Sequence, residues 1–486
     1  MNYVINKALG IIAFFLFPVA VRAVMLQTDS TRTNLIFILT DQWRGQALGF
    51  LGIEPVLTPY LDSLAKESLV LTRTIANYPL CSPSRASLLT GNYPIKTNVY
   101  SNVNSRSTPY GVELSQYAAT WSDALHANGY SNGYIGKWHL DSPQAPYVPT
   151  DNNKGDVKWN EWTPPHKRHG NDFWYAYGTY DAHLRPMYWS TGASRDSFRF
   201  VDQWGPEHEV DKAISYLKNE GGGYRDNKRP FSLFLSVNPP HSPYDQVPEK
   251  YVRRFSHLDP EKLAAALPGV PAADTEEGKL FRESIRQYYA ALFGIDEQVG
   301  RLLKVVNELG LSKNTIIVFT SDHGNCLGRN MEVSKNSHHE ESLRVPFMIH
   351  WKDHIKARID SALLFSLVDV CPTLLSLMNI RPLKPTDGKS RAAYFLGNGG
   401  VVADVQYFMG RIAPDNRNTG FRGVRNETYK LVYDKKGGKE NVYLFNYLKD
   451  PYDQHNLASS EPGTVKSLTR MLQQWLADSG DPYVID

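Results

Sequence analysis

Cysteine is scarce in this chain: three residues among 486, namely Cys81, Cys326 and Cys371. They are too few and too far apart for a disulfide framework, and none has the Cys-x-x-Cys spacing of a zinc site. The sequence leaves open whether Cys326 and Cys371 pair.

An excess of one charge is also missing. The formal net charge is +3, from 53 basic and 50 acidic residues, and the sequence has no acidic tail. Nucleic-acid binding proteins usually carry a strongly basic patch or stripe. We therefore expect no nucleic-acid partner.

Long hydrophobic runs are rare, and the clearest lies at the N-terminus. Lys7 precedes an apolar run over residues 8–21, and Val21-Arg22-Ala23 offers small residues of the kind a signal peptidase reads. The run is too short to span a membrane, and no cysteine follows it that could carry lipid. We expect residues 1–23 to be a signal peptide, and the mature protein to be secreted or periplasmic without a stable membrane anchor.

The remaining length favours one large domain with a smaller one. Continuous apolar runs, typical of strands buried on both faces, alternate with helical patterns of which residues 289–309 are the clearest. The expected strands cover residues 34–40, 130–135, 231–237, 315–319 and 345–351. This alternation predicts an α/β fold over residues 24–380, with a large mixed, mostly parallel sheet sandwiched by helices.

A different pattern begins near residue 381. Alternating stretches at residues 429–433 and 442–445 follow Gly-rich turns, and an amphipathic segment at 465–476 closes the chain. We expect residues 381–486 to form a smaller C-terminal α+β subdomain with an antiparallel sheet.

Polar clusters follow the first four expected strands. They read Asp41-Gln42, Gly136-Lys137-Trp138-His139, Asn238-Pro239-Pro240-His241 and Asp322-His323-Gly324. Parallel sheets bind ligands at the carboxyl ends of their strands, so these side chains are predicted to meet on one rim.

Two of these clusters carry metal-ligand chemistry. Asp41 with Gln42 and Asp322 with His323 suit calcium or magnesium, and the histidine also permits manganese or zinc, although aspartate at a strand end is often only a turn former. Lys137 and His139 lie two residues apart, so on an extended segment both would face one side. An exposed lysine and a core histidine are the structural alternative.

The stretch at residues 81–91 reads Cys-Ser-Pro-Ser-Arg-Ala-Ser-Leu-Leu-Thr-Gly. Pro83 early and Gly91 at the end are the expected punctuation of a short helix, with Cys81 at its positive end and Arg85 four residues on. A thiol beside a cation at a helix start is typical of reactive cysteines, although buried inert cysteine is commoner.

This stretch resembles the maturation signature of the type I sulfatases, which belong to the alkaline phosphatase superfamily. The resemblance continues through Gly-Lys-Trp-His at residues 136–139 to the Asp-Pro-Tyr-Asp-Gln-His-Asn-Leu stretch that starts at residue 450. It implies that Cys81 is oxidised to formylglycine (3-oxoalanine), whose hydrate is the nucleophile. A formylglycine-generating or an anaerobic maturation enzyme is then an expected partner.

The resemblance also implies roles for the other groups. Lys137 and Lys335 bind the sulfate, His139 positions the hydrate, and His241 is the candidate proton donor to the leaving group. Arg85 holds the aldehyde hydrate. The metal ligands would be Asp41, Gln42, Asp322 and His323, together with residue 81 itself. Calcium is the usual metal, with magnesium or manganese possible, because Asp-Gln and Asp-His here replace the commoner Asp-Asp and Asp-Asn pairs.

Two further histidine-containing segments give weaker indications. Aromatic residues at 171–189 surround His183 and Arg185, which fits either a sugar-and-anion platform or ordinary core packing. His338 and His339 follow Lys335; one alternative is that one of them contacts substrate, and the favoured interpretation is that both lie at the surface.

The sequence thus predicts an exported sulfatase acting on a sulfated carbohydrate or polysaccharide. The alternatives are a phosphonate or phosphate-diester hydrolase of the same superfamily, or a non-catalytic sulfoglycan-binding protein if Cys81 is not converted. Sugar identity, sulfate position, endo or exo action and oligomeric state are not encoded in any pattern found.

Overall fold

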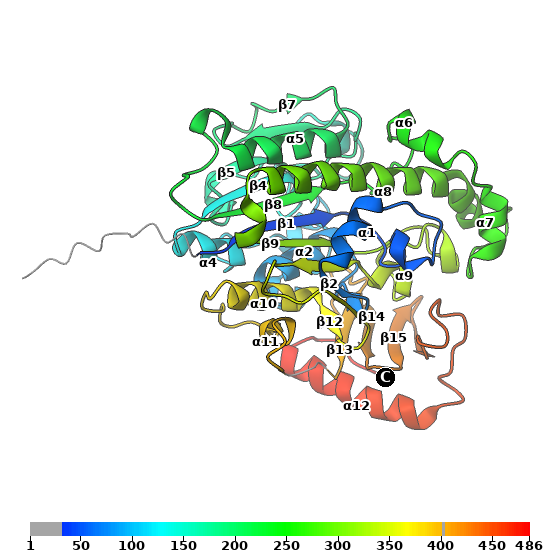
Figure 1. Cartoon of the computed structure of the whole chain (residues 1–486). Helices are drawn as coiled ribbons and strands as arrows, with labels where there is room; N and C mark the ends of the chain where they lie inside the picture. The colour runs from blue at the N-terminus through cyan, green and yellow to red at the C-terminus, as the bar shows by residue number, and fades with distance from the viewer. Residues whose placement is uncertain (1–31, 401–403) are drawn as a thin grey trace, which may run out of the picture.

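The computed structural model of the chain describes residues 32–400 and 404–486 (Figure 1). The predicted signal peptide, residues 1–23, lies outside the described residues. No helix in the described part of the chain is both long and apolar enough to cross a membrane.

The main sheet has ten strands in the order β11-β2-β10-β9-β1-β8-β4-β5-β6-β7. Its central strands β9, β1, β8, β4 and β5 run parallel, whereas β10, β6 and β7 pair antiparallel with their neighbours. This confirms the predicted mixed, mostly parallel sheet. The bounds are β1 Asn34–Thr40, β2 Leu69–Leu71, β4 Ser131–Lys137, β5 Phe173–Tyr177, β6 Met187–Ser190, β7 Arg199–Phe200, β8 Phe231–Val237, β9 Thr315–Ser321, β10 Phe347–His350 and β11 Arg358–Asp360; a separate pair joins β3 Thr74–Ile75 and β12 Phe365–Ser366.

The position of β1 between two hydrophobic cores explains why its sequence is apolar throughout. Ile36 and Ile38 face one hydrophobic core, while Leu35, Phe37 and Leu39 face a second core on the opposite side. Successive strand residues point to opposite faces, so a sheet covered on both sides needs an unbroken apolar run.

Helices cover both faces of the sheet (Figure 1). The first core contains side chains of α1 Pro59–Lys66, α5 Gly205–Lys218 and α8 Glu276–Glu308, and the second contains those of α2 Cys81–Thr90, α4 Trp121–Ala127 and α10 Val370–Leu377. The shorter helices are α3 Pro94–Thr97, α6 Glu249–Val252, α7 Pro260–Ala266, α9 Glu340–Leu343 and α11 Ala392–Phe395. The predicted helix at 289–309 is the C-terminal part of α8, which begins earlier, at Glu276 after the N-cap Thr275.

The C-terminal region forms a four-stranded antiparallel sheet, β13-β14-β15-β16, backed by α12 Pro462–Ser479. Its strands are β13 Gln406–Gly410, β14 Gly420–Arg425, β15 Lys430–Lys436 and β16 Lys439–Phe445. Val424, Leu431 and Leu472 belong to the same hydrophobic core as Leu35 of β1. The small sheet therefore shares the hydrophobic core that covers one face of the large sheet (Figure 1).

Candidate active site

Four side chains from three separate elements meet at the carboxyl ends of the central strands. Asp41 follows β1, Asp322 and His323 follow β9, and Cys81 is the first residue of α2. One ligand atom from each of these four residues lies within 4.8 Å of the other three, and all four residues are buried. The predicted meeting of strand-end groups on one rim is thus observed, with Cys81 among them.

Helix α2 places the thiol. Leu80 is extended, the helix begins at Cys81, and Gly91 ends it in the left-handed conformation with φ of 72°. Pro83 is tolerated because it lies in the first turn, where its missing N–H has no partner within the helix. Cys81 thus occupies the positive end of the helix, as its sequence punctuation predicts.

Positive groups surround the sulfur. Cys81 Sγ lies 3.1 Å from Lys335 Nζ, 3.9 Å from Lys137 Nζ and 3.3 Å from His323 Nε2. Burial and the Asp41 carboxylate raise the pKa of the thiol, but Lys137, Lys335 and His323 outweigh them, and the pKa lies well below its ordinary value. The pocket around position 81 is therefore built to hold negative charge.

Arg85 lies one helical turn after Cys81 and holds both carboxylates. Its Nε donates to Asp322 Oδ2 at 2.9 Å and its Nη2 to Asp41 Oδ2 at 3.1 Å. Its Nη1 also donates to the Lys137 carbonyl at 2.7 Å. Arg85 therefore ties the ends of β1, β4 and β9 to helix α2.

The buried carboxylates of Asp41 and Asp322 lie within 4.8 Å of each other, which suits a divalent cation. Burial raises the pKa of Asp41, but Lys137, Lys335, His241 and His323 together hold it well below the ordinary value. Burial and the Asp41 charge raise the pKa of Asp322 to about 6. Two carboxylates with an imidazole form a donor set that calcium, magnesium or manganese accepts, and a cation would relieve the repulsion between the carboxylates.

Gln42 adds a further oxygen donor to the site, and its backbone adopts the strained left-handed conformation. Its φ is 77°, and its N–H donates to Asp322 Oδ1 at 3.2 Å. The side-chain Oε1 accepts from Lys335 Nζ at 3.0 Å, while Nε2 donates to Tyr244 and Ser334 hydroxyls. Because the two hydroxyls fix the amide orientation, its carbonyl oxygen points toward the cluster.

Lys137 reaches the cluster from the last residue of β4, two residues beyond the predicted end of that strand. Its Nζ donates to Asp41 Oδ2 at 2.7 Å and to Asn238 Oδ1 at 3.0 Å. Gly136 before it has φ of 100°, and a side chain there would meet the Ser236 carbonyl at 2.0 Å. Position 136 must therefore be a glycine for the strand to place Lys137 at the cluster.

His139 corrects one expectation. The residue is left-handed, with φ of 56°, so the segment after Lys137 is not extended and the predicted two-residue alternation does not apply. The buried ring donates from Nε2 to the Val103 carbonyl at 3.0 Å. Burial lowers the pKa of His139, so the ring is neutral with its proton on Nε2, and Nδ1 is the nitrogen that can accept a proton.

The loop after β8 carries His241, which is partly buried. Its Nδ1 lies 3.5 Å from Asp181 Oδ1, and the buried His183 ring donates to the His241 carbonyl at 2.9 Å. His183 therefore holds the loop that carries His241 in place. Asp181 was not predicted as a site residue. Asn238 belongs to a strand-end cluster predicted to meet on this rim, but no role was predicted for it.

Arg185 lies apart from the cluster, exposed, with its Nε donating to Asp202 at 2.8 Å. The aromatic residues around it are mostly core: Trp174, Tyr177, Tyr188 and Trp189 are buried. The core-packing interpretation of this segment is thus confirmed for these four rings.

Lys335 and the two histidines that follow it lie in the segment after β9. Lys335, chosen from the family resemblance, has a side chain 13% exposed and contacts the sulfur. The surface expectation is wrong for His338, which is buried and packs against Tyr443 and Phe445 of β16. Cys326 and Cys371 are buried free thiols.

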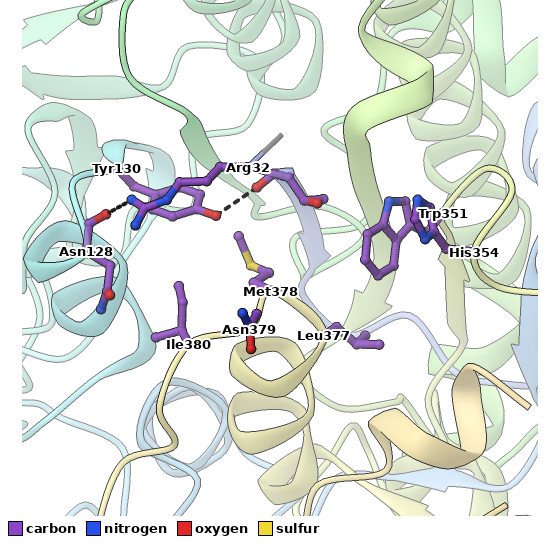
Figure 2. Close-up of a pocket in the computed structure, with 10 residues that line it drawn as sticks. Arg32, Asn128, Tyr130, Trp351, His354, Leu377, Met378, Asn379 and Ile380 are labelled. Atoms are coloured by element: carbon purple, nitrogen blue, oxygen red, sulfur yellow. Dashed lines mark hydrogen bonds between the residues drawn. The ribbon is translucent and has the colours of Figure 1, made fainter. Parts of the chain in front are cut away.

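Another pocket, drawn in Figure 2, lies at the opposite end of the sheet. Thr33 and Tyr130 in its wall immediately precede β1 and β4, and Trp351 follows the antiparallel β10. These residues stand at the amino ends of the parallel strands, and none of the cluster described above lines it. It is therefore not part of this site.

Comparison with known proteins assigns the family. The model of the family described as Sulfatase matches residues 33–380, and the model described as N-sulphoglucosamine sulphohydrolase, C-terminal, matches residues 332–480. An endo-4-O-sulfatase of Bacteroides thetaiotaomicron is 34% identical, with 93% of each chain covered. An ulvan-active sulfatase of Formosa agariphila is 32% identical over 95% of this chain and 84% of its own.

Solved structures agree. A Bacteroides fragilis protein named as a sulfatase, yidJ, is 45% identical with a TM-score of 0.89, covering 94% of this chain and 98% of its own. The phosphonate monoester hydrolase of Agrobacterium radiobacter has a TM-score of 0.69, covers 92% of this chain and 96% of its own and, at 22% identity, shares the fold alone. The chain belongs to the sulfatase family.

Proposed function

We propose that this sulfatase is exported and hydrolyses sulfate esters of a carbohydrate or polysaccharide. The observation that carries the proposal is the position of Cys81, whose sulfur lies among two lysines, a histidine and two carboxylates at the strand ends. The relatives named as an endo-4-O-sulfatase and an ulvan-active sulfatase support a glycan substrate.

The side chain at position 81 is proposed to act as formylglycine. Its hydrate supplies the nucleophilic oxygen for attack on sulfur, and a dedicated maturation enzyme converts the thiol. The divalent metal, proposed to be calcium, supplies Lewis-acid polarisation of the sulfate. Asp41, Gln42, Asp322 and His323 would hold it together with residue 81.

The remaining groups of the chain stabilise charge and move protons. Lys137 and Lys335 both lie beside the sulfur of residue 81 and offset negative charge that develops on the sulfate oxygens. Arg85 keeps Asp41 and Asp322 in place and adds a third positive charge. His241 donates a proton to the departing sugar oxygen. His139 Nδ1 then accepts the proton of the remaining hydroxyl of residue 81 as the covalently bound sulfate leaves and the aldehyde re-forms.

The proposal also includes the domain bounds and two substrate-contacting residues. Residues 1–23 would direct export, residues 24–380 would form the catalytic domain, and residues 381–486 the C-terminal subdomain. Of the proposed substrate contacts, His183 acts through the His241 loop. Arg185, exposed and paired with Asp202, would meet a distal part of a long substrate.

The ligand set keeps a phosphonate or phosphate-diester hydrolase as second candidate. Gln42 stands where the usual sulfatase set has a second aspartate, and His323 where it has an asparagine, so the site has one negative charge fewer and one nitrogen donor more. Rates on an aryl sulfate and on the matching aryl phosphodiester separate the two: kcat/KM is expected to be higher for the sulfate, and a higher value for the diester would overturn the proposal.

A further inference from the structure

The unconverted protein, which carries a thiol at position 81, presents a different donor set from the converted one. The cluster then offers one sulfur, one imidazole nitrogen and two carboxylate oxygens, from Cys81, His323, Asp41 and Asp322. Calcium takes about six to eight oxygen ligands, whereas thiolate and imidazole are ligands that zinc prefers. The sulfur atom therefore changes which metal these four positions suit.

The spacing of the donors is that of a tetrahedral zinc site. Cys81 Sγ lies 3.3 Å from His323 Nε2 and 3.7 Å from Asp41 Oδ1. His323 Nε2 lies 3.4 Å from Asp41 Oδ1 and 3.5 Å from Asp322 Oδ1. Zinc bonds of about 2.0–2.3 Å at tetrahedral angles place neighbouring donor atoms about 3.3–3.8 Å apart. All four of these distances therefore fit zinc coordination.

Contacts on the far side of each donor hold it in the required orientation. His323 Nδ1 donates to the carbonyl of the next residue at 2.9 Å, so in the neutral ring Nε2 keeps its lone pair and faces the cluster. Asp41 Oδ2 accepts from Lys137 Nζ at 2.7 Å. Asp322 Oδ2 accepts from Arg85 Nε at 2.9 Å. The Oδ1 atom of each carboxylate is thus left on the side of the imidazole.

The charge balance also favours a divalent cation in the thiol form. A thiol that binds a metal loses its proton, so the sulfur would add a negative charge to those of the two carboxylates. Lys137, Lys335 and Arg85 place three positive charges around them. A neutral oxygen at position 81 would leave two negative charges against the same three positive ones. The thiolate form therefore repels a divalent cation less.

Cys81 is also the thiol that a metal ion can reach. Its sulfur lies 3.1 Å from Nζ of Lys335, whose side chain is 13% exposed, so one side chain separates the sulfur from solvent. Cys326 and Cys371 are buried, and neither belongs to a metal-ligand cluster within the described ranges.

We propose that the protein, before conversion of Cys81, binds one zinc ion through the four residues of this cluster, and that conversion removes the preference for zinc. The zinc–sulfur bond forms as the thiol proton leaves to solvent, and no electrons are transferred. The zinc site of the unconverted protein goes beyond the proposed function, whereas its loss rests on the proposed conversion. Bound zinc would join the ends of β1 and β9 to the start of α2.

The test uses full-length protein produced without a maturation enzyme, in which the mass of the residue-81 peptide confirms the thiol. Metals are removed with a chelator, zinc chloride is added, the excess is removed by gel filtration, and bound zinc is measured by elemental analysis. One zinc ion per chain is expected to stay bound in excess calcium. A chain that retains no zinc, or loses it to calcium, would overturn the inference.

Cobalt identifies the sulfur ligand without any substitution. Co²⁺ accepts the same ligand types as zinc, and a cobalt–thiolate bond gives a charge-transfer band in the near ultraviolet. This band is expected when Co²⁺ is added to the metal-free, unconverted protein. A bound cobalt ion without the band would contradict coordination by Cys81.

Two matched variants assign the band to one thiol. Cys81→Ser is expected to lower the affinity for zinc by about 100-fold or more and to abolish the band, because serine offers a protonated oxygen in place of the thiolate. Cys371→Ser, on α10 and outside the cluster, should keep both at the wild-type value. Circular dichroism confirms that each variant is folded. Equal zinc affinity of folded Cys81→Ser and the wild-type chain would overturn the inference.

The outcomes keep this inference apart from the proposed activity. Zinc binding by the unconverted protein is decided without any turnover. Converted protein that hydrolyses an aryl sulfate but binds zinc as tightly as the unconverted chain overturns the loss of preference alone. Converted protein that hydrolyses no sulfate ester overturns the proposed activity and leaves the zinc site of the unconverted protein in place.

Discussion

At the residue scale, the catalytic centre depends on charges that reach residue 81 from distant parts of the chain. Lys335 is the clearest example: its Nζ contacts both Cys81 Sγ, at 3.1 Å, and Gln42 Oε1, at 3.0 Å. Burial lowers the pKa of Lys335, but Cys81 and Asp41 outweigh burial and raise it, so the lysine stays charged.

Replacing Lys335 by Met is expected to lower kcat/KM for a sulfate ester by about 10²–10³-fold, the usual effect of losing one group that stabilises developing charge. Lys335→Arg should retain part of the activity. Steady-state kinetics on an aryl sulfate measure the effect, with the exposed Lys304→Met on α8 as control. A loss below about threefold for Lys335→Met would contradict the assignment of Lys335 to the sulfate.

The sequence predicted most of these residues because each stands directly after a buried strand or in a motif. His139 is the exception in geometry: its left-handed backbone turns the ring in a way that an extended segment does not. Asp181 was missed because its role comes from contact with His241, sixty residues away in sequence, and no local pattern marks such a contact.

At the scale of elements, the segment that carries Lys335 is fastened to the C-terminal sheet by buried ion pairs. Lys430 of β15 donates to Asp453 Oδ2 at 2.5 Å, to Glu340 Oε1 at 3.1 Å and to the His338 carbonyl at 2.9 Å. Arg425 of β14 also contacts Glu340, at 3.0 Å. The small sheet thus anchors α9 and the loop before it.

Lys430→Met is expected to reduce the free energy of unfolding by about 3–5 kcal/mol, since it leaves two buried carboxylates with one partner fewer. Lys304→Met removes an exposed pair with Glu308 and should cost less than about 0.5 kcal/mol. Denaturant unfolding measures both. Equal stability of the two variants would show that the buried cluster does not hold the sheet in place.

The extent of each element was less predictable than its existence. Strand β4 continues to Lys137 because Gly136 pairs with Ser236 of β8 and Lys137 with Tyr177 of β5, partners far away in sequence. Helix α8 begins before its strong apolar stripe, because Thr275 caps it by accepting from the Gly278 N–H. His338 is buried by β16, a strand that lies about one hundred residues later.

At the scale of the whole molecule, one buried acid links stability to pH. Glu209 of α5 is fully buried, and the hydroxyls of Tyr177 and Tyr188 donate to its Oε1 at 3.2 and 3.1 Å. Burial raises the pKa of Glu209 to about 8, while these hydrogen bonds only partly offset it. The carboxyl is therefore protonated in the folded protein at neutral pH.

The folded state holds this proton up to about pH 8, whereas the unfolded chain releases it near pH 4.5. The stabilisation is fully present below the unfolded pKa and is lost as pH rises toward the folded pKa, by up to about 1.4 kcal/mol per pH unit. Glu209→Gln keeps an acceptor for the tyrosines and removes this term. Between pH 5 and 8, the free energy of unfolding should fall less steeply with rising pH in the variant than in the wild-type protein. Identical slopes for the two proteins would contradict the raised pKa of Glu209.

The most direct test of the account is the mass of the peptide that carries residue 81, measured together with sulfate release. In protein produced with an active maturation enzyme, conversion of the Cys81 thiol to an aldehyde lowers the peptide mass by about 18 Da. The account predicts that converted protein releases sulfate from a sulfated glycan and that Cys81→Ala does not. Converted protein that releases no sulfate, or an unconverted thiol with full sulfatase activity, would contradict it.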